Sequence, residues 1–80
     1  MLRFAMLVLA CAGILSSAHA EEPLRVGSKR FTESYILGEI LTQTAARVGP
    51  AEHKQGLGNT AIVLGALRSG AIDVYPEYLG

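Results

Sequence analysis

The 80-residue sequence has little cysteine, little aromatic surface and no charge excess, and each scarcity excludes a class of protein. A single cysteine excludes an internal disulfide framework, and no cluster of cysteine and histidine has the spacing of a zinc site. Tryptophan is absent, and aromatic residues make up 6% of the chain. Seven basic residues balance seven acidic ones, whereas nucleic-acid-binding domains usually carry a basic excess. We therefore expect no metal site, no cofactor and no nucleic-acid partner.

Residues 1–20 have the three parts of an export signal in order. Arg3 supplies positive charge, an uncharged apolar stretch of about twelve residues follows, and Ala18-His19-Ala20 matches the A-x-A cleavage pattern. A helix that spans a bilayer needs roughly 20 apolar residues, so a retained membrane anchor is the weaker interpretation. A lipoprotein acylated at Cys11 is a second alternative. We predict a signal peptide over residues 1–20, cleavage after Ala20, and a partial domain over residues 21–80 in an oxidising compartment.

The first half of this partial domain predicts a strand and a helix. Leu24–Gly27 is a short alternating run typical of a strand. Thr32 is the expected N-cap of the helix, with Glu33 in its first turn, and Gly49-Pro50 ends the pattern. The apolar positions at helical spacing, which we expect to face the core, are Ile36, Leu37, Ile40, Leu41, Ala45 and Val48, and those expected at the surface are Glu39, Gln43 and Arg47.

The second half repeats this alternation. Glu52–Gln55 is a weak candidate for a second strand, Gly56–Gly58 is an expected turn, and Asn59 or Thr60 can cap a second helix that Ser69-Gly70 closes. Ile72–Tyr75 then reads as a third strand, which Pro76 ends. The order β-α-β-α-β is typical of a parallel sheet covered by helices, so we predict an α/β fold.

A nucleotide-binding site is one alternative that the motifs raise. Gly56–Ala61 satisfies G-x-G-x-x-G/A, and Glu77 lies about twenty residues further on, where a dinucleotide fold places its ribose-binding acid. However, Glu52–Gln55 is polar where this fingerprint needs a buried strand, and export leads to a compartment poor in nicotinamide cofactor. A glycine turn that leads into a helix is the simpler interpretation.

Residues 21–80 contain no constellation typical of an enzyme. Their serines lack the G-x-S-x-G context of a nucleophile. Glu33 and Glu39 are six positions apart, so they do not share a helix face as an acid–base pair would. His53, the only histidine in this part of the chain, is interpreted as a solvated surface residue. We therefore expect no enzymatic activity.

The carboxyl edge of the predicted sheet carries the residues most typical of a ligand site. Tyr75 and Tyr78 bracket Pro76-Glu77 after the third strand, at the edge where open α/β sheets bind ligands. Aromatic rings attract cations, and several rings together bind quaternary ammonium groups. Lys29 follows the first strand at the same edge. The alternatives are that Tyr78 only packs over the sheet and that Lys29 is only solvated.

Four segments of the sequence together resemble the substrate-binding proteins of ABC importers for glycine betaine, choline and carnitine. Each segment has the order and spacing of that family. The resemblance implies a two-lobed, type II periplasmic-binding-protein fold, of which residues 21–80 would form the first part of lobe one, as a truncated fragment. The four segments are Val26–Glu39, Gly56–Thr60, Ala66–Asp73 and Tyr75–Tyr78.

The resemblance also implies a function and two site residues. It implies a periplasmic binding component for a quaternary ammonium osmolyte, working with membrane permease and ATPase subunits. Tyr78 matches the tyrosine that forms one wall of the family's aromatic cage, and Lys29 matches a position that contributes a polar contact beside the ligand. Leu79 stands where the family commonly has threonine. A secreted nucleotide-binding enzyme built on Gly56–Ala61 and a nonfunctional truncated product remain the alternatives.

Overall fold

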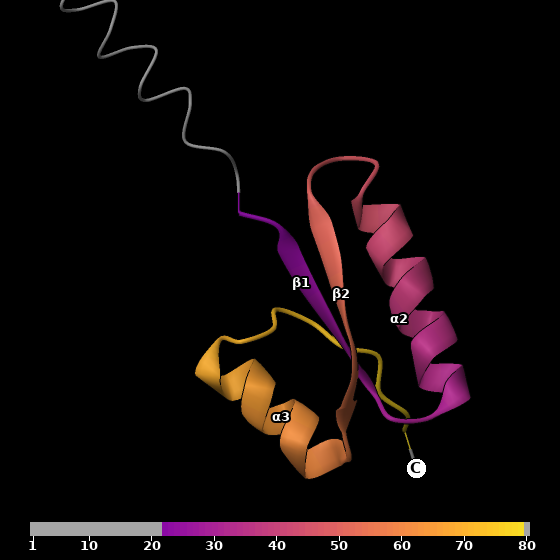
Figure 1. Ribbon diagram of the computed structural model, residues 1–80, viewed down its shortest axis with the longest axis vertical. Helices are drawn as coiled ribbons and strands as arrows, with labels where there is room; N and C mark the ends of the chain where they lie inside the picture. Colours follow the sequence, from indigo (N-terminus) through magenta and orange to yellow (C-terminus); the bar gives the residue numbers. More distant parts are fainter. Residues whose placement is uncertain (1–21, 80) are drawn as a thin grey trace, which may run out of the picture.

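The computed structural model describes residues 22–79, so the predicted signal peptide lies outside the described residues. Strands and helices alternate along this part of the chain in the order β1 (Leu24–Lys29), α2 (Thr32–Ala45), β2 (Ala51–Gly58) and α3 (Thr60–Ser69), as Figure 1 shows. Between residues 22 and 79, neither helix has the length and apolar character needed to cross a membrane.

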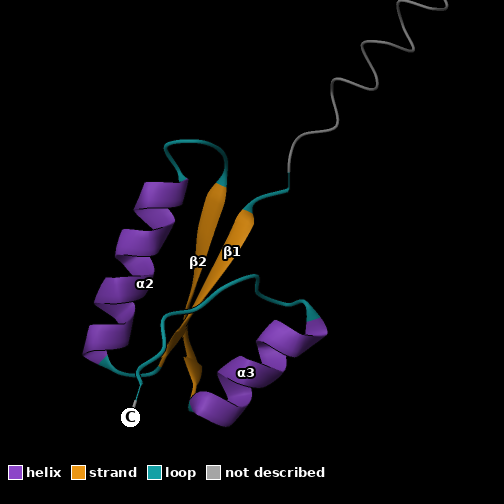
Figure 2. Ribbon diagram, turned by 180° about the vertical axis from the view of Figure 1, so that it is seen from behind, coloured by secondary structure: helices purple, strands orange, loops and turns teal. Residues whose placement is uncertain are grey.

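The strands form a small parallel sheet with β1 at its centre. Val26 pairs with His53 of β2 on one edge of β1 and bridges Val74 on the other edge, in parallel both times. The Gly27 amide donates to the Val74 carbonyl at 2.8 Å. Helices α2 and α3 lie on opposite sides of the strands (Figure 2). The α/β fold with a parallel sheet is therefore confirmed. One helix lies on each side of the sheet, as right-handed crossover connections require.

The strand bounds differ from those predicted in three ways. The first strand continues to Lys29 instead of ending at Gly27. The expected turn at Gly56–Gly58 is wrong, because these residues continue the second strand, and the positive φ angles of 67° at Gly56 and 150° at Gly58 show why glycine is needed there. The third predicted strand, Ile72–Tyr75, is reduced to the bridge at Val74.

The caps of α3 are confirmed, whereas the predicted start of α2 is wrong by one residue. The Asn59 side chain accepts a hydrogen bond from the Ile62 amide at 3.1 Å, and Gly70 ends α3 in the left-handed conformation with a φ of 83°. In α2, Phe31 occupies the N-cap position without a side-chain cap, and Thr32 is the first helical residue.

The predicted buried face of α2 is also wrong. Its buried residues are Ser34, Gly38 and Thr42, which lie four positions apart on the side that faces the sheet. The isoleucines at 36 and 40 are 55% and 58% exposed. Small residues allow a helix to lie close to a sheet, so the face with the least side-chain volume packs inward. The apolar residues left exposed in and just after α2 are Ile36, Leu37, Ile40, Leu41 and Val48.

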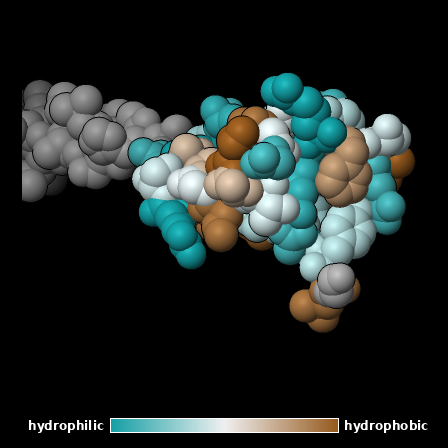
Figure 3. Space-filling view, turned by 90° about the horizontal axis from the view of Figure 1, so that it is seen from below, coloured by the Kyte–Doolittle hydropathy of each residue, from teal (hydrophilic) through white to brown (hydrophobic). Residues whose placement is uncertain are grey.

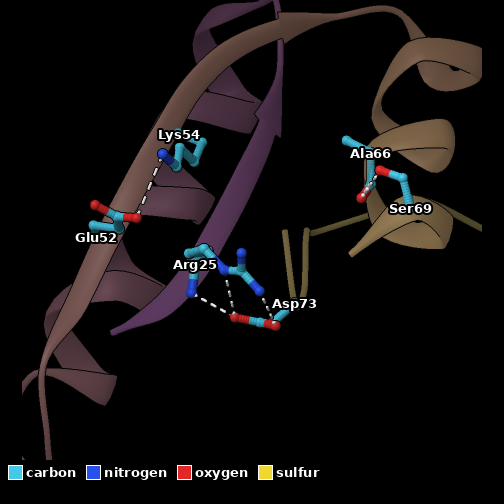
Figure 4. A network of polar contacts seen from close by, with 6 residues as sticks. All are labelled: Arg25, Glu52, Lys54, Ala66, Ser69 and Asp73. Atoms are coloured by element: carbon cyan, nitrogen blue, oxygen red, sulfur yellow. Dashed lines mark hydrogen bonds and ion pairs between the residues drawn. The ribbon is translucent and has the colours of Figure 1, made fainter. Parts of the chain in front are cut away.

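The segment Ile72–Val74, which takes the place of the third predicted strand, is attached to β1 by packing and by a charged clamp. Val26, Val63 and Ile72 form the core, each at most 1% exposed. The Arg25 amide and Nη2 donate to the Asp73 carboxylate at 2.8 and 3.2 Å, and the Asp73 amide donates to the Arg25 carbonyl at 2.8 Å (Figure 4). This two-pronged contact holds the chain beside β1 where the sheet ladder is short.

Candidate functional site

The candidate site lies where β1 and β2 end and both helices begin. This is the lower end of the molecule in Figure 1, and the chain returns to it after Val74. Open parallel sheets bind ligands outside the carboxyl ends of their strands. Lys29 is the last residue of β1 and Phe31 is the N-cap of α2, so both belong to this edge.

Lys29 forms an ion pair with Glu77. The lysine side chain is 11% exposed, and its ammonium group donates to Oε1 of Glu77. The same carboxylate accepts the Tyr78 amide at 2.9 Å and the Tyr75 hydroxyl at 3.1 Å. The hydrogen bond from Lys29, followed by that from the Tyr78 amide, lowers the pKa of Glu77. The positive charge of Lys29 is therefore compensated within the chain.

The backbone on both sides of Lys29 is fixed by its neighbours. The Lys29 amide donates to the buried Ser34 hydroxyl in the first turn of α2 at 2.8 Å. The Arg30 amide donates to the Gly58 carbonyl at the end of β2 at 3.0 Å. The start of α2 and the end of β2 thus fix the backbone from which the Lys29 side chain extends.

Phe31 and Tyr78 form an aromatic pair at the same edge. Their ring centroids are 6.0 Å apart with an interplanar angle of 35°, and the two residues are 42% and 43% exposed. Burial raises the pKa of the Tyr78 hydroxyl, and the charge of Glu33 adds to this shift. The tyrosine therefore stays neutral, and its ring remains partly open to solvent.

Phe31 was missed from the sequence, while Tyr75 has a different role from Tyr78. An aromatic residue two positions after the end of a strand is the signal that could have identified Phe31. The Tyr75 hydroxyl donates to Glu77, and burial, reinforced by Glu77, raises the pKa of Tyr75. Tyr75 thus anchors the carboxylate that pairs with Lys29, whereas Tyr78 pairs with a second ring.

A surface hollow lies beside these groups. Figure 3 looks at this end of the molecule, and hydrophobic and hydrophilic surface alternate there without one continuous apolar patch. Such mixed surface suits a ligand with both apolar and polar parts. Among residues 22–79, no three histidine, cysteine or acidic side chains are grouped to hold a metal ion. The hollow is lined by Lys29, Arg30, Phe31, Gly58, Asn59, Thr60 and Ile62.

A second polar cluster joins Ser28, His53 and Glu39. Ser28 Oγ lies 2.8 Å from Nε2 of His53, and Nδ1 of His53 lies 2.9 Å from Oε2 of Glu39. The histidine side chain is 7% exposed, so its interpretation as a solvated residue is wrong. Its hydrogen bond, followed by one from Gln43, lowers the pKa of Glu39. The cluster ties α2 to both strands.

The chain of contacts from serine to histidine to carboxylate matches that of a hydrolase triad. The serine, however, is not accessible to a substrate. Ser28 is fully buried, and its hydroxyl oxygen also accepts the Gly56 amide at 3.2 Å. A nucleophilic serine must reach a substrate carbonyl, which requires an exposed oxygen. The contacts of Ser28 therefore support the packing of β1 against β2, and they offer no acyl-transfer site.

Comparison with known proteins places these features in a family. Residues 22–80 match the family described as the substrate-binding domain of the ABC-type glycine betaine transport system. The glycine betaine-binding protein YehZ of Escherichia coli K12 is 43% identical over 70 residues, which cover 86% of this chain and 23% of that protein. A glycine-betaine-binding protein of Pseudomonas aeruginosa is 41% identical over 76 residues, which cover 92% of this chain and 24% of that protein.

The match is confined to part of these relatives. The chain spans about a quarter of the length of the two curated relatives. No solved structure matches it. Because the family match covers the whole of the part described by the structure, the chain belongs to the family of substrate-binding domains of ABC-type glycine betaine transport systems.

Proposed function

We propose that residues 22–79 supply one wall of a binding site for a quaternary ammonium compound such as glycine betaine, choline or carnitine. The observation that carries this proposal is the pair of exposed rings, Phe31 and Tyr78, beside a lysine that Glu77 neutralises. Ring faces attract cations that cannot form hydrogen bonds, and desolvation strengthens this attraction. The two rings form part of a cage, which further aromatic residues complete in the full-length protein.

The ion pair at Lys29 makes this edge compatible with a cationic ligand. An uncompensated ammonium group would repel the trimethylammonium group of choline or glycine betaine. Glu77 removes this repulsion while keeping the lysine in place. The ammonium group of Lys29 then interacts with two carboxylates, that of Glu77 and that of the bound glycine betaine.

The same family membership supports a non-enzymatic role in transport. The complete protein works in the periplasm, delivering its ligand to a membrane permease driven by ATPase subunits, and residues 1–20 direct its export. The contacts made by the nucleotide-like motif favour this role over that of an enzyme. Gly56 and Gly58 lie within β2, and the Glu77 carboxylate already binds Lys29, Tyr75 and the Tyr78 amide.

Calorimetric titration of a completed protein tests the proposal. Residues 21–80 are joined to the part of the Escherichia coli relative that they do not match, and glycine betaine, choline and NAD are titrated separately. Tyr78→Ala should weaken binding by roughly 2- to 30-fold, since a cation–π contact contributes about 0.5–2 kcal/mol. Tyr75→Ala, the matched control, should have the smaller effect. Binding of NAD alone would contradict the proposal.

The 80-residue chain without this completion should show no micromolar binding. Micromolar affinity corresponds to roughly −8 kcal/mol, which one cation–π contact and one polar contact do not supply. Titration of the chain by itself measures this directly. Micromolar binding to a monomer would overturn the one-wall description, whereas binding that depends on dimer formation would place the second wall on another copy.

A further inference from the structure

His53 lies outside the proposed binding site, although its contacts lead to that site. The histidine side chain is 7% exposed, and each of its ring nitrogens has a partner, Ser28 for one and Glu39 for the other. Ser28 immediately precedes Lys29 in β1. A change at His53 can therefore reach the ligand edge of the sheet through a single side chain.

A bulge in β2 lies beside Ser28. Strand β1 passes from its pair with Lys54 to its pair with Gly58 through one residue, Ser28, whereas β2 uses three residues over the same distance. The Gly56 amide, inside this bulge, donates to the Ser28 hydroxyl oxygen at 3.2 Å. Bulges beside functional sites commonly redirect the chain and its side chains.

The bulge in turn holds the residue between Lys29 and Phe31. The Arg30 amide donates to the Gly58 carbonyl at 3.0 Å, and Arg30 Nε donates to the Gly56 carbonyl at 3.3 Å. Because both contacts converge on Arg30, the position of the bulge sets the direction in which the two site residues leave β1. The hollow beside the aromatic pair includes Gly58, the last residue of β2.

The directions of the hydrogen bonds make His53 the residue that orients Ser28. The Glu39 carboxylate, whose pKa His53 lowers, is ionised and only accepts, so Nδ1 of the ring is the donor. Nε2 of a neutral imidazole then accepts, and the Ser28 hydroxyl donates to it. With its proton directed at the ring, the Ser28 oxygen presents a lone pair to the Gly56 amide.

We infer that His53 is a positioning residue for the ligand site. It acts through Ser28 and the β2 bulge on the segment that carries Lys29 and Phe31. This role rests on the proposed quaternary ammonium site and adds to it a residue that does not touch the ligand. A site whose groups are held in place beforehand binds more tightly, because less order has to be created on binding. Loss of the contact between Ser28 and His53 should therefore weaken binding while every group that faces the ligand is still present.

Amide hydrogen exchange in the 80-residue chain tests the first half of this relay without a ligand. His53→Asn keeps an amide group at the level of Nδ1 and loses the acceptor for Ser28, whereas the amide of His53→Gln reaches the level of Nε2. Exchange of the Gly56 amide should accelerate at least about tenfold in His53→Asn and less than about threefold in His53→Gln. The Gly27 amide, which donates to the Val74 carbonyl, is the internal control and should exchange at the unmodified rate in both variants.

Calorimetric titration of the completed protein tests the second half. His53→Asn should weaken glycine betaine binding at least about fivefold, and His53→Gln should bind within about twofold of the unmodified protein. Ser28→Ala, which removes only a hydroxyl group, should weaken binding as His53→Asn does, and it replaces that variant if the asparagine protein fails to fold. Glu52→Gln, which alters the exposed neighbour of His53 in β2, is the matched control and should leave the Kd unchanged.

Three results would overturn the inference alone. The first is an unchanged exchange rate of the Gly56 amide in His53→Asn, and the second is faster exchange with an unchanged Kd. The third is a loss of binding that His53→Gln does not rescue, because any disturbance of the buried ring would then be sufficient. Absence of binding by the unmodified completed protein would instead overturn the proposed function and, with it, the role of His53.

Discussion

Gly38 lies directly against the imidazole ring of His53. A Cβ atom added at Gly38 would stand 2.6 Å from Nε2 and 3.1 Å from Cε1 of His53, and 3.2 Å from Cβ of Ser28. The ring has no room to withdraw, because Ser28 holds one nitrogen and Glu39 the other. The absence of a side chain at Gly38 therefore allows α2 to lie close to β2. At this distance the carboxylate of Glu39 reaches His53.

Gly38→Ala should destabilise the chain. Overpacking costs about 1–3 kcal/mol, and a contact as short as 2.6 Å favours the upper part of this range over the roughly 1 kcal/mol that alanine gains over glycine in a helix. We expect the free energy of unfolding to fall by up to about 2 kcal/mol in urea denaturation. Gly65→Ala is the matched control in α3, where an added Cβ meets no atom within 4 Å, and it should raise stability by up to about 1 kcal/mol. Equal effects of the two variants would contradict the close packing at Gly38.

Ile40→Ala and Ile72→Ala should separate the exposed face of α2 from the core. Ile72 is 1% exposed, so its truncation leaves a cavity and should cost about 2–5 kcal/mol. Ile40 is 58% exposed, so its truncation in the chain by itself should change the free energy of unfolding by less than about 0.5 kcal/mol. Urea denaturation of both variants measures this. A large loss from Ile40→Ala alone would restore the buried face predicted from the sequence.

The sequence predicted where α2 lies but not which side of it is buried. The helical spacing of the apolar residues identified the helix, and Gly49-Pro50 indicated where it must end. The spacing misplaced the buried face, because it treats the most apolar side as the inward one. That assumption fails here, because Ser34, Gly38 and Thr42 face the sheet. Their selection depends on close approach, which hydropathy does not measure.

Acidification should weaken the clamp between Arg25 and Asp73. Hydrogen bonds from the Arg25 side chain and then its amide lower the pKa of Asp73 below its ordinary 3.8. The unfolded chain therefore binds this proton at higher pH than the folded chain, so the clamp's contribution is complete above the ordinary pKa and is lost as pH falls through the folded value. Asp73→Asn should lower Tm at neutral pH and reduce the loss of Tm between about pH 5 and about pH 2.

Glu52→Gln is the control for this titration. It removes an exposed carboxylate that faces Lys54 at 3.4 Å on the surface of β2, a kind of pair that contributes little to stability. Its Tm should follow that of the unmodified chain across the whole range. An Asp73→Asn profile parallel to that of the unmodified chain would mean that the clamp does not titrate with folding.

Glu77→Gln should change ligand preference in the completed protein. The variant leaves the Lys29 ammonium uncompensated, which disfavours choline and favours the carboxylate of glycine betaine. We expect the ratio of the choline Kd to the glycine betaine Kd to rise at least about fivefold at low salt, and less at high salt. Adding Lys29→Met should return the ratio to its original value. An unchanged ratio in Glu77→Gln would show that Lys29 does not face the ligand.

The export signal predicted over residues 1–20 leads to a prediction about the mature terminus. Signal peptidase cleavage after Ala20 should give exported protein whose first residue is Glu21, because the A-x-A pattern ends there. N-terminal sequencing or intact-mass measurement of the exported protein checks this. A lipid-modified Cys11 at the terminus would instead identify a lipoprotein.

The candidate site could be predicted in part, because some of its signals are local and others span the chain. Lys29 and Tyr78 follow from their places after strands and from the family resemblance. The pairing of Lys29 with Glu77 joins residues 48 positions apart, so no local pattern reports it. His53 lies among polar neighbours in the sequence, and its partners Ser28 and Glu39 are 25 and 14 positions away. Such contacts become visible only when the sheet is assembled.

The central place of β1 has a consequence for how the chain is made. Ribosomes release this strand first, yet its contacts reach 25 positions ahead to His53 and 48 positions ahead to Asp73. Contacts between residues so far apart form slowly. Residues 24–29 thus stay without a neighbour on one edge until synthesis has passed Gly58, and on the other edge until it has passed Asp73. An unpaired strand is a site of aggregation. If residues 1–20 act as the predicted export signal, late completion of this sheet should keep the nascent chain unfolded for passage across the membrane.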